Sequence, residues 1–439
     1  MIIGIRREDK NRWERRTPIV PDDVRKLIRE TGLRFHVQPS PIRVFADEEY
    51  AAAGAEIRED LSECRLIVGV KEVPVELLIP GKAYLFFAHV IKCQPYNMKM
   101  LARLLELGCT LMDYELITDA AGRRLVFFGR YAGLAGMIDT LHALGRRLAV
   151  EGIPNPFEEM RSAHEYRDLE EAETAVDRIA TRIRTDGLDA RIAPLVFGFA
   201  GYGHVSQGAQ EILGRLPVEE VPPAALASLR DGRSRAGRAI YKTVFKEADM
   251  VVPTDATARF DLQDYYRSPE KYRSVFEEYL PHLSVLVNGV FWTERYPRLV
   301  TRAAVRALYR EGSQPHLRVI GDISCDIEGS VEITLKATES DQPCFVYRPA
   351  TDDIVEGYAG NGPVVMAVDN LPCELPRESS IFFSQVLRDF VAAFKTTELE
   401  GPFEKLPLPD PLKRATIAYQ GSLRPPFAYI AEHLGGGKP

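Results

Sequence analysis

The segment Leu195-Val-Phe-Gly-Phe-Ala-Gly-Tyr-Gly-His-Val-Ser-Gln-Gly-Ala209 combines an apolar strand, a glycine-rich turn and the small residues that begin a helix. Gly201 and Gly203 lack a Cβ atom, so the backbone can turn tightly there and come close to a pyrophosphate. The helix that begins near His204 points its N–H groups and the positive end of its dipole at the same anion. The segment therefore predicts a dinucleotide site. The predicted cofactor-binding residues within it are Gly201, Tyr202, Gly203, His204, Val205 and Ser206.

The glycine pattern on its own also fits an ordinary corner between a strand and a helix. Ser206 stands where the usual fingerprint has its third glycine, and chance matches of a glycine triplet are common. The apolar run before the turn and the helical pattern Gln207-Gly-Ala-Gln-Glu-Ile-Leu213 after it supply the context that the motif needs. We therefore favour the dinucleotide site over the plain corner.

The composition is that of an ordinary soluble globular protein, with 45% hydrophobic and 27% charged residues. A length of 439 residues argues for two domains. The 56 basic and 63 acidic side chains give a net charge of −7 without a basic block, which argues against nucleic acid as a partner. No apolar stretch reaches the roughly 20 residues of a membrane helix and no signal-peptide core follows the N-terminus, so we expect a cytoplasmic protein. The six cysteines show no C-x-x-C spacing, so neither a disulfide framework nor a metal site is indicated.

Strands and helices alternate along the chain, which predicts parallel sheets covered on both faces. The first half begins with strands at 1–5, 35–37 and 66–70, and it ends with a strand at 125–128 and a long helix at 131–151. A second alternating unit has expected strands at 195–200, 218–221, 283–287 and 317–320. The last hundred residues carry expected strands at 330–335, 344–347 and 364–368, a loop at 353–362 and a helix at 380–394. These could form a third domain, but we favour a tail that folds back on the first domain.

Three polar side chains, Lys71, His89 and Glu115, follow predicted strands of the first half. In an open parallel sheet the carboxyl ends of the strands share one edge, so these side chains should line a common crevice. Taken singly, each also fits a solvated, buried or helix-capping residue. Arg15 and Arg16 add guanidinium groups suited to bidentate binding of a carboxylate, although a pair of exposed charges before a proline turn is the simpler reading of these two alone.

Several longer stretches resemble one known family. They are Trp13-Glu-Arg-Arg-Thr-Pro18, Gly69-Val-Lys-Glu72, Phe86-Phe-Ala-His-Val-Ile-Lys92, Asp113-Tyr-Glu115, Phe128-Gly-Arg-Tyr-Ala-Gly-Leu-Ala-Gly-Met137, Gly321-Asp-Ile-Ser324 and Val368-Asp-Asn-Leu-Pro372. In this order they span nearly the entire chain. The sequence closely resembles the lysine-2-oxoglutarate reductase half of the bifunctional aminoadipic semialdehyde synthases and, more distantly, saccharopine dehydrogenases and alanine dehydrogenases.

The resemblance implies an α/β fold of two Rossmann-like, doubly wound domains with a cleft between them, the first of them discontinuous. The substrate and catalytic domain, similar to the N-terminal domain of alanine dehydrogenases, would comprise residues 1–150 plus 335–439. The dinucleotide-binding Rossmann domain would comprise residues 151–334.

The resemblance also implies a reaction. The ε-amine of lysine condenses with the keto group of 2-oxoglutarate, and hydride from a reduced nicotinamide cofactor converts the imine to saccharopine. In relatives the residues that match Lys71 and His89 are the catalytic acid–base pair. Free lysine has a pKa of about 10.4, so a base must take a proton before the amine can attack, and an acid must protonate the departing hydroxyl. The residues that match Glu14, Arg16, Glu72 and Glu115 hold the substrates or tune the acid–base pair in relatives. The predicted substrate-binding residues are Glu14, Arg15, Arg16, Glu72 and Glu115, and Asp322 joins the cofactor-binding set.

The sequence favours NADPH as the cofactor and leaves NADH open. An acidic residue about 20 positions past the first glycine normally binds the ribose 2′-hydroxyl of NAD. The predicted second nucleotide strand runs instead into two prolines, although Glu219 and Glu220 lie just before them. Arg230, Arg233 and Arg235 follow and could meet a 2′-phosphate.

Three rival functions remain from the sequence. Two are enzymes: a lysine-forming, NAD-dependent saccharopine dehydrogenase and another opine-type reductase. The third is a non-catalytic dinucleotide-binding regulator, which loss of Lys71 or His89 would indicate, and both residues are present. Because the chain stops soon after the reductase portion, we expect a separate saccharopine-cleaving enzyme, and a homo-oligomer stays open. His204 and Gln207 replace the Asn and Lys that relatives often have, so a positive charge near the phosphates is missing.

Overall fold

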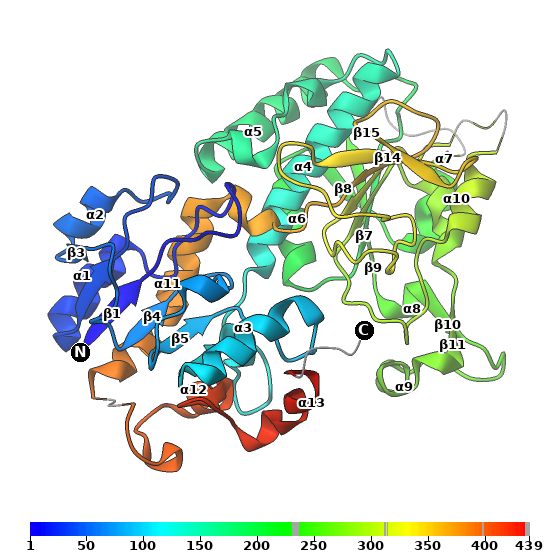
Figure 1. Ribbon diagram of the computed structural model, residues 1–439. Helices are drawn as coiled ribbons and strands as arrows, with labels where there is room; N and C mark the ends of the chain where they lie inside the picture. The colour runs from blue at the N-terminus through cyan, green and yellow to red at the C-terminus, as the bar shows by residue number, and fades with distance from the viewer. Residues whose placement is uncertain (231–236, 311–312, 314, 397–398, 435–439) are drawn as a thin grey trace. The chain divides into compact units, whose positions relative to one another are not determined.

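The computed structural model describes residues 1–230, 237–310, 313, 315–396 and 399–434. The described residues form two compact units, unit 1 (Met1–Phe128 with Pro376–Pro439) and unit 2 (Gly129–Leu375), each built on an eight-stranded sheet (Figure 1). The expected α/β fold with two doubly wound domains, the first of them discontinuous, is confirmed. No helix in the described part of the chain is long and apolar enough to cross a membrane.

The sheet of unit 1 has the strand order β18-β17-β6-β5-β4-β1-β2-β3. Its strands are β1 (Ile2–Ile5), β2 (Arg34–Val37), β3 (Glu56–Ile57), β4 (Leu66–Val68), β5 (Ala83–Phe86), β6 (Thr110–Asp113), β17 (Thr416–Tyr419) and β18 (Ser422–Leu423). Strands β1 to β6 pair in parallel, and every residue of β4, β5 and β6 is buried. Continuous burial of this kind is typical of a parallel sheet with helices on both faces. The helices of unit 1 are α1 (Pro21–Thr31), α2 (Asp47–Ala52), α3 (Pro95–Glu106), α11 (Pro376–Ala392), α12 (Asp410–Ala415) and α13 (Ala431–Leu434).

The chain from Pro376 onward folds back on unit 1, as predicted for the tail, whereas the expected strands at 344–347 and 364–368 belong to the sheet of unit 2. Strand β17 pairs antiparallel with β6, and α11 packs against α1. On α11, the ring of Phe383 stacks on Phe128 with centroids 4.5 Å apart and meets Tyr114 edge-on at 4.9 Å. Buried aromatic pairs of this geometry stabilise a core beyond the area that they bury. The segment is therefore part of the core of unit 1.

The sheet of unit 2 has the strand order β15-β14-β16-β13-β12-β7-β9-β8. Its strands are β7 (Val196–Ala200), β8 (Val218–Glu220), β9 (Ile240–Phe245), β12 (Val285–Asn288), β13 (Val319–Asp322), β14 (Cys344–Arg348), β15 (Asp353–Glu356) and β16 (Val364–Met366), and a separate hairpin consists of β10 (Val251–Pro253) and β11 (Tyr272–Ser274). The strands from β8 to β16 in this order are parallel, whereas β14 and β15 are antiparallel. The helices are α4 (Gly129–Val150), α5 (Leu169–Asp186), α6 (His204–Leu213), α7 (Leu226–Arg230), α8 (Glu247–Met250), α9 (Leu262–Arg267) and α10 (Arg302–Leu308).

Strand β9 was missed from the sequence, and it changes the strand order around the glycine-rich turn. β9 pairs with β7 along its length, from Val196 opposite Tyr241 to Ala200 opposite Phe245. β8, which the sequence analysis took as the second nucleotide strand, pairs only with β9 and lies at the edge of the sheet. The end of β9, and not the end of β8, is therefore the neighbour of the turn.

Helices α4 and α6 cross at two glycines. A Cβ atom on Gly133 of α4 would lie 2.0 Å from the carbonyl oxygen of Val205, and one on Gly208 of α6 would lie 2.1 Å from that of Arg130. The close packing that the third glycine of the fingerprint normally permits is thus provided here by Gly208, two positions after Ser206. Because α4 also packs on β13, it belongs to unit 2. The units divide at 128/129 and 375/376, which differs from the expected boundaries at 150 and 335.

Two expected strands are absent, and one expected loop contains a strand. Residues 125–128 form no strand, and the nearby pairing is an isolated bridge between Thr118 and Arg124. In 330–335 only Val331 makes a bridge, to Val300. The loop expected at 353–362 contains β15 instead, which pairs with β14 as an antiparallel edge. The errors concern short segments, in which apolar runs do not distinguish a strand from buried irregular chain.

Candidate active site

The three side chains that the sequence placed at strand ends follow neighbouring strands of unit 1. Lys71 comes after β4, His89 after β5 and Glu115 after β6, and these strands pair in parallel in that order. Their carboxyl ends therefore share one edge of the sheet. All three side chains are partly exposed, so they line this edge rather than the core.

His89 and Glu115 form a pair at this edge. The distance from His89 Nδ1 to Glu115 Oε1 is 3.6 Å, and Arg124 donates to the same carboxylate at 3.2 Å. The hydrogen bond with His89 and the charge of Arg124 lower the pKa of Glu115. His89 has a φ of +51°, a left-handed backbone conformation that is uncommon outside glycine. The amide of Asn97 donates to the carbonyls of Ala88 and His89 and holds the backbone in this conformation.

Lys71 is positioned through its backbone by a buried acid. The carboxylate of Glu8 accepts the N–H of Val70 at 2.7 Å and that of Lys71 at 2.9 Å. Burial raises the pKa of Glu8 to about 7. Burial also lowers the pKa of Lys71, and the positive charge of Arg16 lowers it further, while the carboxylate of Glu14 acts in the opposite direction. A larger neutral fraction makes Lys71 a better proton acceptor near neutral pH than an exposed lysine.

Glu72 lies beside Lys71 and faces several cations. Its carboxylate accepts from Lys10 Nζ at 3.2 and 3.3 Å. Burial raises the pKa of Glu72, but a backbone hydrogen bond and the charges of Lys10, His89 and Lys71 more than offset this, so the net shift is downward. The carboxylate of Glu72 therefore interacts electrostatically with both Lys71 and His89.

The two arginines of the Trp13-Glu-Arg-Arg stretch have different surroundings. Arg16 binds Glu14 in a bidentate manner, with Nε–Oε1 at 2.7 Å and Nη2–Oε2 at 2.6 Å, and both side chains are buried. Its guanidinium also lies 4.3 Å from the centre of the Phe128 ring. Arg15 is exposed and donates to the carbonyl of Ile42. Arg16 and Glu14 therefore act on Lys71 as a buried ion pair, and Arg15 is not brought together with the group.

Two positioning residues of this edge were missed by sequence reasoning. Besides Glu8, the buried carboxylate of Asp113 accepts the N–H of Ala88 at 3.2 Å and that of Glu115 at 2.9 Å. It thus fixes the chain on either side of the His89–Glu115 pair. Burial raises the pKa of Asp113 to about 7. The Asp-x-Glu spacing gives the Asp113 bond to Glu115 a local signal, since an Asp commonly accepts the N–H two residues on, but no local pattern reveals the bond to Ala88.

The glycine-rich turn of unit 2 has the geometry that a dinucleotide needs. Gly201 has a φ of +88°, and a Cβ atom on it would lie 3.1 Å from Val290 Cγ1. A Cβ atom on Gly203 would meet nothing within 4 Å, so space is open in front of the helix. α6 begins at His204, and its N-cap is Gly203, which has no side chain to accept the free N–H groups of the first turn. The turn can therefore bring its backbone to a pyrophosphate, which the helix dipole would stabilise.

The remaining predicted cofactor residues differ in exposure. Tyr202 and His204 are exposed and Val205 is half-buried, whereas Ser206 is buried and accepts from the amide of Gln210. Asp322, at the end of β13, is also buried. Its two oxygens accept from Asn288 at 2.8 Å and from Thr334 at 2.5 Å. Both oxygens of Asp322 are thus engaged within the sheet edge.

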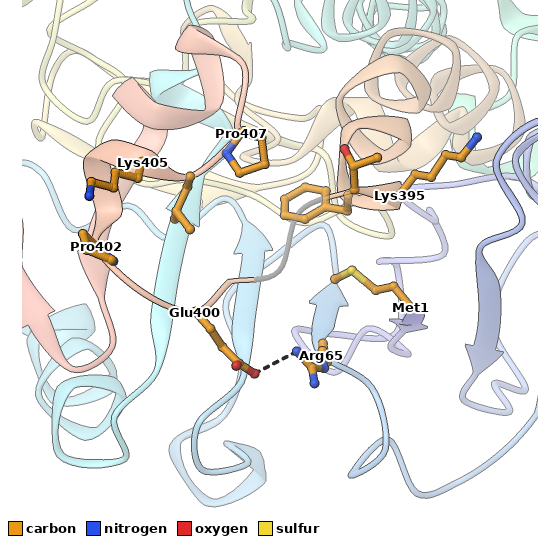
Figure 2. Close-up of a pocket in the computed structure, with 10 residues that line it drawn as sticks. Met1, Arg65, Lys395, Glu400, Pro402, Lys405 and Pro407 are labelled. Atoms are coloured by element: carbon orange, nitrogen blue, oxygen red, sulfur yellow. Dashed lines mark hydrogen bonds and ion pairs between the residues drawn. The ribbon is translucent and has the colours of Figure 1, made fainter.

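A cavity of about 530 Å³ in unit 1 has none of the predicted site residues in its lining (Figure 2). Met1 and Arg65, which line it, precede β1 and β4, so it opens at the amino ends of the strands. Arg65 forms an ion pair with Glu400 across it at 2.9 Å. Active sites of open α/β sheets lie at the carboxyl ends, so this cavity is not the candidate site. In the described residues, no group of three or more His, Cys, Asp and Glu side chains could hold a metal ion.

Two family models match the chain on either side of the glycine-rich turn. The alanine dehydrogenase/PNT N-terminal domain matches residues 4–135, and the alanine dehydrogenase/PNT C-terminal domain matches residues 254–425. The chain belongs to the alanine dehydrogenase/PNT family. The strand ends of β4, β5 and β6 fall within the N-terminal match, and β12, β13 and β16 fall within the C-terminal match.

Two relatives of this chain are more than twice as long as the chain, and a third is of similar length. The chain is 40% identical to the alpha-aminoadipic semialdehyde synthase of Arabidopsis thaliana over 98% of the chain, which is 41% of that protein. It is 37% identical to the mitochondrial alpha-aminoadipic semialdehyde synthase of Bos taurus over 98% of the chain and 47% of that protein. The chain thus spans less than half the length of these relatives. It is also 27% identical to the lysine-forming saccharopine dehydrogenase [NAD(+)] of Neurospora crassa, over 88% of the chain and 89% of that protein.

The chain has the fold of a solved L-alanine dehydrogenase. An L-alanine dehydrogenase structure aligns with a TM-score of 0.60 at 18% identity and covers 99% of this chain and 100% of that chain. The transhydrogenase of Sinorhizobium meliloti aligns with a TM-score of 0.54 at 15% identity and covers 97% of this chain and 100% of that chain. The family that the two models identify is one of nicotinamide dinucleotide-dependent oxidoreductases, and the two solved structures show the shared fold alone.

Proposed function

We propose that the protein is a saccharopine-forming lysine-2-oxoglutarate reductase. The observation that carries the proposal is the edge of unit 1 at which Lys71 follows β4, His89 follows β5 and Glu115 lies 3.6 Å from the histidine ring. The names of the relatives support the same pathway, since aminoadipic semialdehyde synthases match over 98% of the chain. The balanced reaction consumes lysine, 2-oxoglutarate, a reduced dinucleotide and one proton, and it gives saccharopine, the oxidised dinucleotide and water.

The residues at this edge can perform both proton transfers. The ε-ammonium of lysine must lose a proton to attack the keto carbon, and the neutral amine of Lys71 can accept it because burial lowers the pKa of Lys71. The resulting carbinolamine must lose its hydroxyl as water. His89, held by the carboxylate of Glu115, can donate the proton for this step. The carboxylate of Glu72 can hold the cationic amine of the substrate.

The dinucleotide supplies hydride to the imine carbon when it is bound. Gly201, Gly203 and the start of α6 would hold its pyrophosphate, because the backbone there is open and the helix dipole favours an anion. NADPH was preferred on the sequence because of the prolines after 218–221 and of Arg230, Arg233 and Arg235. The residues after β8 do not decide the cofactor, because β9 lies between β8 and β7 and β8 is not the neighbour of the glycine-rich turn. Arg233 and Arg235 lie outside the described residues.

A second candidate is a lysine-forming saccharopine dehydrogenase. The Neurospora crassa enzyme of that name matches over 88% of this chain and 89% of its own length, so it is a relative of similar size. The same residues would serve, because the two reactions are one equilibrium approached from opposite sides. The identity of 27%, against 40% for the aminoadipic semialdehyde synthase, makes this the weaker candidate.

The test is oxidation of reduced dinucleotide by the purified protein. Absorbance at 340 nm is followed with lysine and 2-oxoglutarate together, with each omitted in turn, and with ornithine or pyruvate substituted, using NADH and NADPH separately. We expect loss of absorbance only with lysine and 2-oxoglutarate together. Faster turnover of saccharopine with the oxidised dinucleotide would favour the lysine-forming enzyme. No loss of absorbance with any pair of amino acid and oxo acid, although a dinucleotide binds, would contradict the proposal and favour a regulatory protein.

A further inference from the structure

The neighbour of the glycine-rich turn on the β9 side is the segment that begins with Phe245. The N–H of Gly201 donates to the carbonyl of Phe245 at 3.2 Å, so the turn and the end of β9 are joined directly. In a doubly wound sheet, the residue that meets the adenosine ribose stands at the carboxyl end of the strand beside the first one. Because β9 occupies that place here, the ribose position falls just after Phe245 and not on β8.

A cavity of about 480 Å³ opens at this point in unit 2. It is lined by the turn (Gly201, Tyr202 and Gly203), by Glu247 and by Tyr266. Its remaining wall is mostly apolar and aromatic and comes from α8, α9 and the chain after β12. Ligand sites are commonly apolar cavities of about 300–1,000 Å³ with a few placed polar groups, and this one adjoins the expected pyrophosphate site. The cavity suits the adenosine half of a dinucleotide.

Glu247 is held in this cavity by two phenols. Tyr266 Oη donates to Glu247 Oε1 at 2.6 Å, and Tyr202 Oη donates to Glu247 Oε2 at 3.1 Å. Among the described residues, no lysine or arginine forms an ion pair with Glu247 within 4.0 Å. A carboxylate has about four lone-pair sites, so Glu247 can accept two further hydrogen bonds. The side chain of Glu247 is thus a fixed acceptor with capacity for the two hydroxyls of a diol.

Glu247 is the acid among the residues that line the cavity, and two other acids near the ends of β8 and β9 are already engaged. The carboxylate of Asp249 turns back and accepts the N–H of Lys246 at 2.9 Å, which caps α8. Glu220 on β8 pairs with Lys242 Nζ at 2.7 Å. Glu247 is therefore the acid that faces the cavity. The side chain of Lys246, its neighbour, is exposed.

We propose that Glu247 accepts hydrogen bonds from the 2′- and 3′-hydroxyls of the adenosine ribose and excludes a 2′-phosphate, so that the protein prefers NADH to NADPH. The inference rests on the dinucleotide part of the proposed function and names its cofactor. A hydroxyl donates to the carboxylate, whereas a phosphate presents only negative oxygens to it. Like charges placed together in a binding site repel each other and weaken binding.

The test is direct titration of dinucleotide binding, which does not require turnover. Intrinsic fluorescence quenching or calorimetry gives Kd for NADH and for NADPH in the wild type, Glu247→Gln, Glu247→Arg and the control Glu220→Gln. We expect the wild type to bind NADH at least about tenfold more tightly than NADPH. In Glu247→Gln this ratio should fall toward one, and in Glu247→Arg it should reverse. Glu220→Gln should keep the wild-type ratio, because Glu220 belongs to the edge strand.

The outcomes separate the inference from the proposed function. Equal or tighter binding of NADPH by the wild type, or a ratio that changes in Glu220→Gln and not in Glu247→Gln, would overturn the role of Glu247 while the reductase proposal stands. Failure of both dinucleotides to bind the folded wild type would overturn both. The wild-type ratio requires no variant, and circular dichroism with thermal melting shows whether each variant is folded.

Discussion

The carboxyl edges of the two sheets differ in what they present. In unit 1 the strands β4, β5 and β6 end in Lys71, His89 and Glu115, and ionisable groups surround each of them. In unit 2 the end of β7 is a turn of glycines, and the cavity beside it has mostly aromatic and aliphatic walls. One edge can move protons, and the other can hold a large, partly apolar anion. The same architecture thus separates chemistry from binding by the residue types at its strand ends.

The largest effect is expected at the charged edge. Lys71→Met and His89→Gln should each lower turnover by about 100- to 10,000-fold, since each removes a group proposed to transfer a proton in the reaction. Stopped-flow or steady-state oxidation of the reduced dinucleotide measures this. Dinucleotide affinity should stay within about twofold of the wild type, because neither residue belongs to the turn of unit 2. Near-normal turnover in both variants would remove the functional distinction between the two edges.

The converse experiment changes the glycine turn. Gly201→Val should weaken dinucleotide binding by about 100-fold, because a β-branched residue at a φ of +88° is strained and its Cβ atom would meet Val290. Gly152→Val is the matched control. Gly152 also lies in unit 2 with a φ of +67°, and a Cβ atom there would meet nothing within 4 Å. If both variants bind alike, strain alone explains the loss and the turn has no special role.

The smallest effect concerns the electrostatics of the charged edge. The carboxylate of Glu72 raises the pKa of Lys71, so Glu72→Gln should lower that pKa. Catalysis by neutral Lys71 grows as the pH rises through its pKa, and the rising limb of kcat/KM should therefore move to lower pH. The exposed Glu76→Gln serves as the control and should leave the limb in place. A limb that moves to higher pH, or does not move, would show that Lys71 does not sense Glu72.

The features that could be predicted from the sequence are those that short local patterns determine. The Gly201–Gly203 turn, the helix after it and the strand ends at Lys71, His89 and Glu115 all depend on neighbours within a few residues. The return of the chain to unit 1 was predicted as well, because a chain that leaves a first domain through a long helix can return to it through another.

Strand order and buried partners could not be predicted, because they depend on residues far apart in the chain. Strand β8 comes first after α6, yet β9 takes the place beside β7, and no local pattern distinguishes the two. The backbone of Lys71 is bound by Glu8, 63 residues earlier, and such bonds arise only when the sheet has formed. The pairing of Arg16 with Glu14 is local, but the residue types alone do not distinguish it from binding of a substrate carboxylate.

Because Phe383 lies late in the chain, the core of unit 1 is completed only late in synthesis. Unit 2 lies wholly within residues 129–375, so it can fold while the rest of the chain is still being synthesised. Unit 1 starts first but lacks α11 and β17 until the last segment emerges, and its buried Tyr114 and Phe87 have no Phe383 to pack against. The nascent unit therefore exposes an aromatic surface and the edge of β6 that β17 later covers for the whole time that unit 2 is translated. We expect the early half of the chain to be the part that binds chaperones.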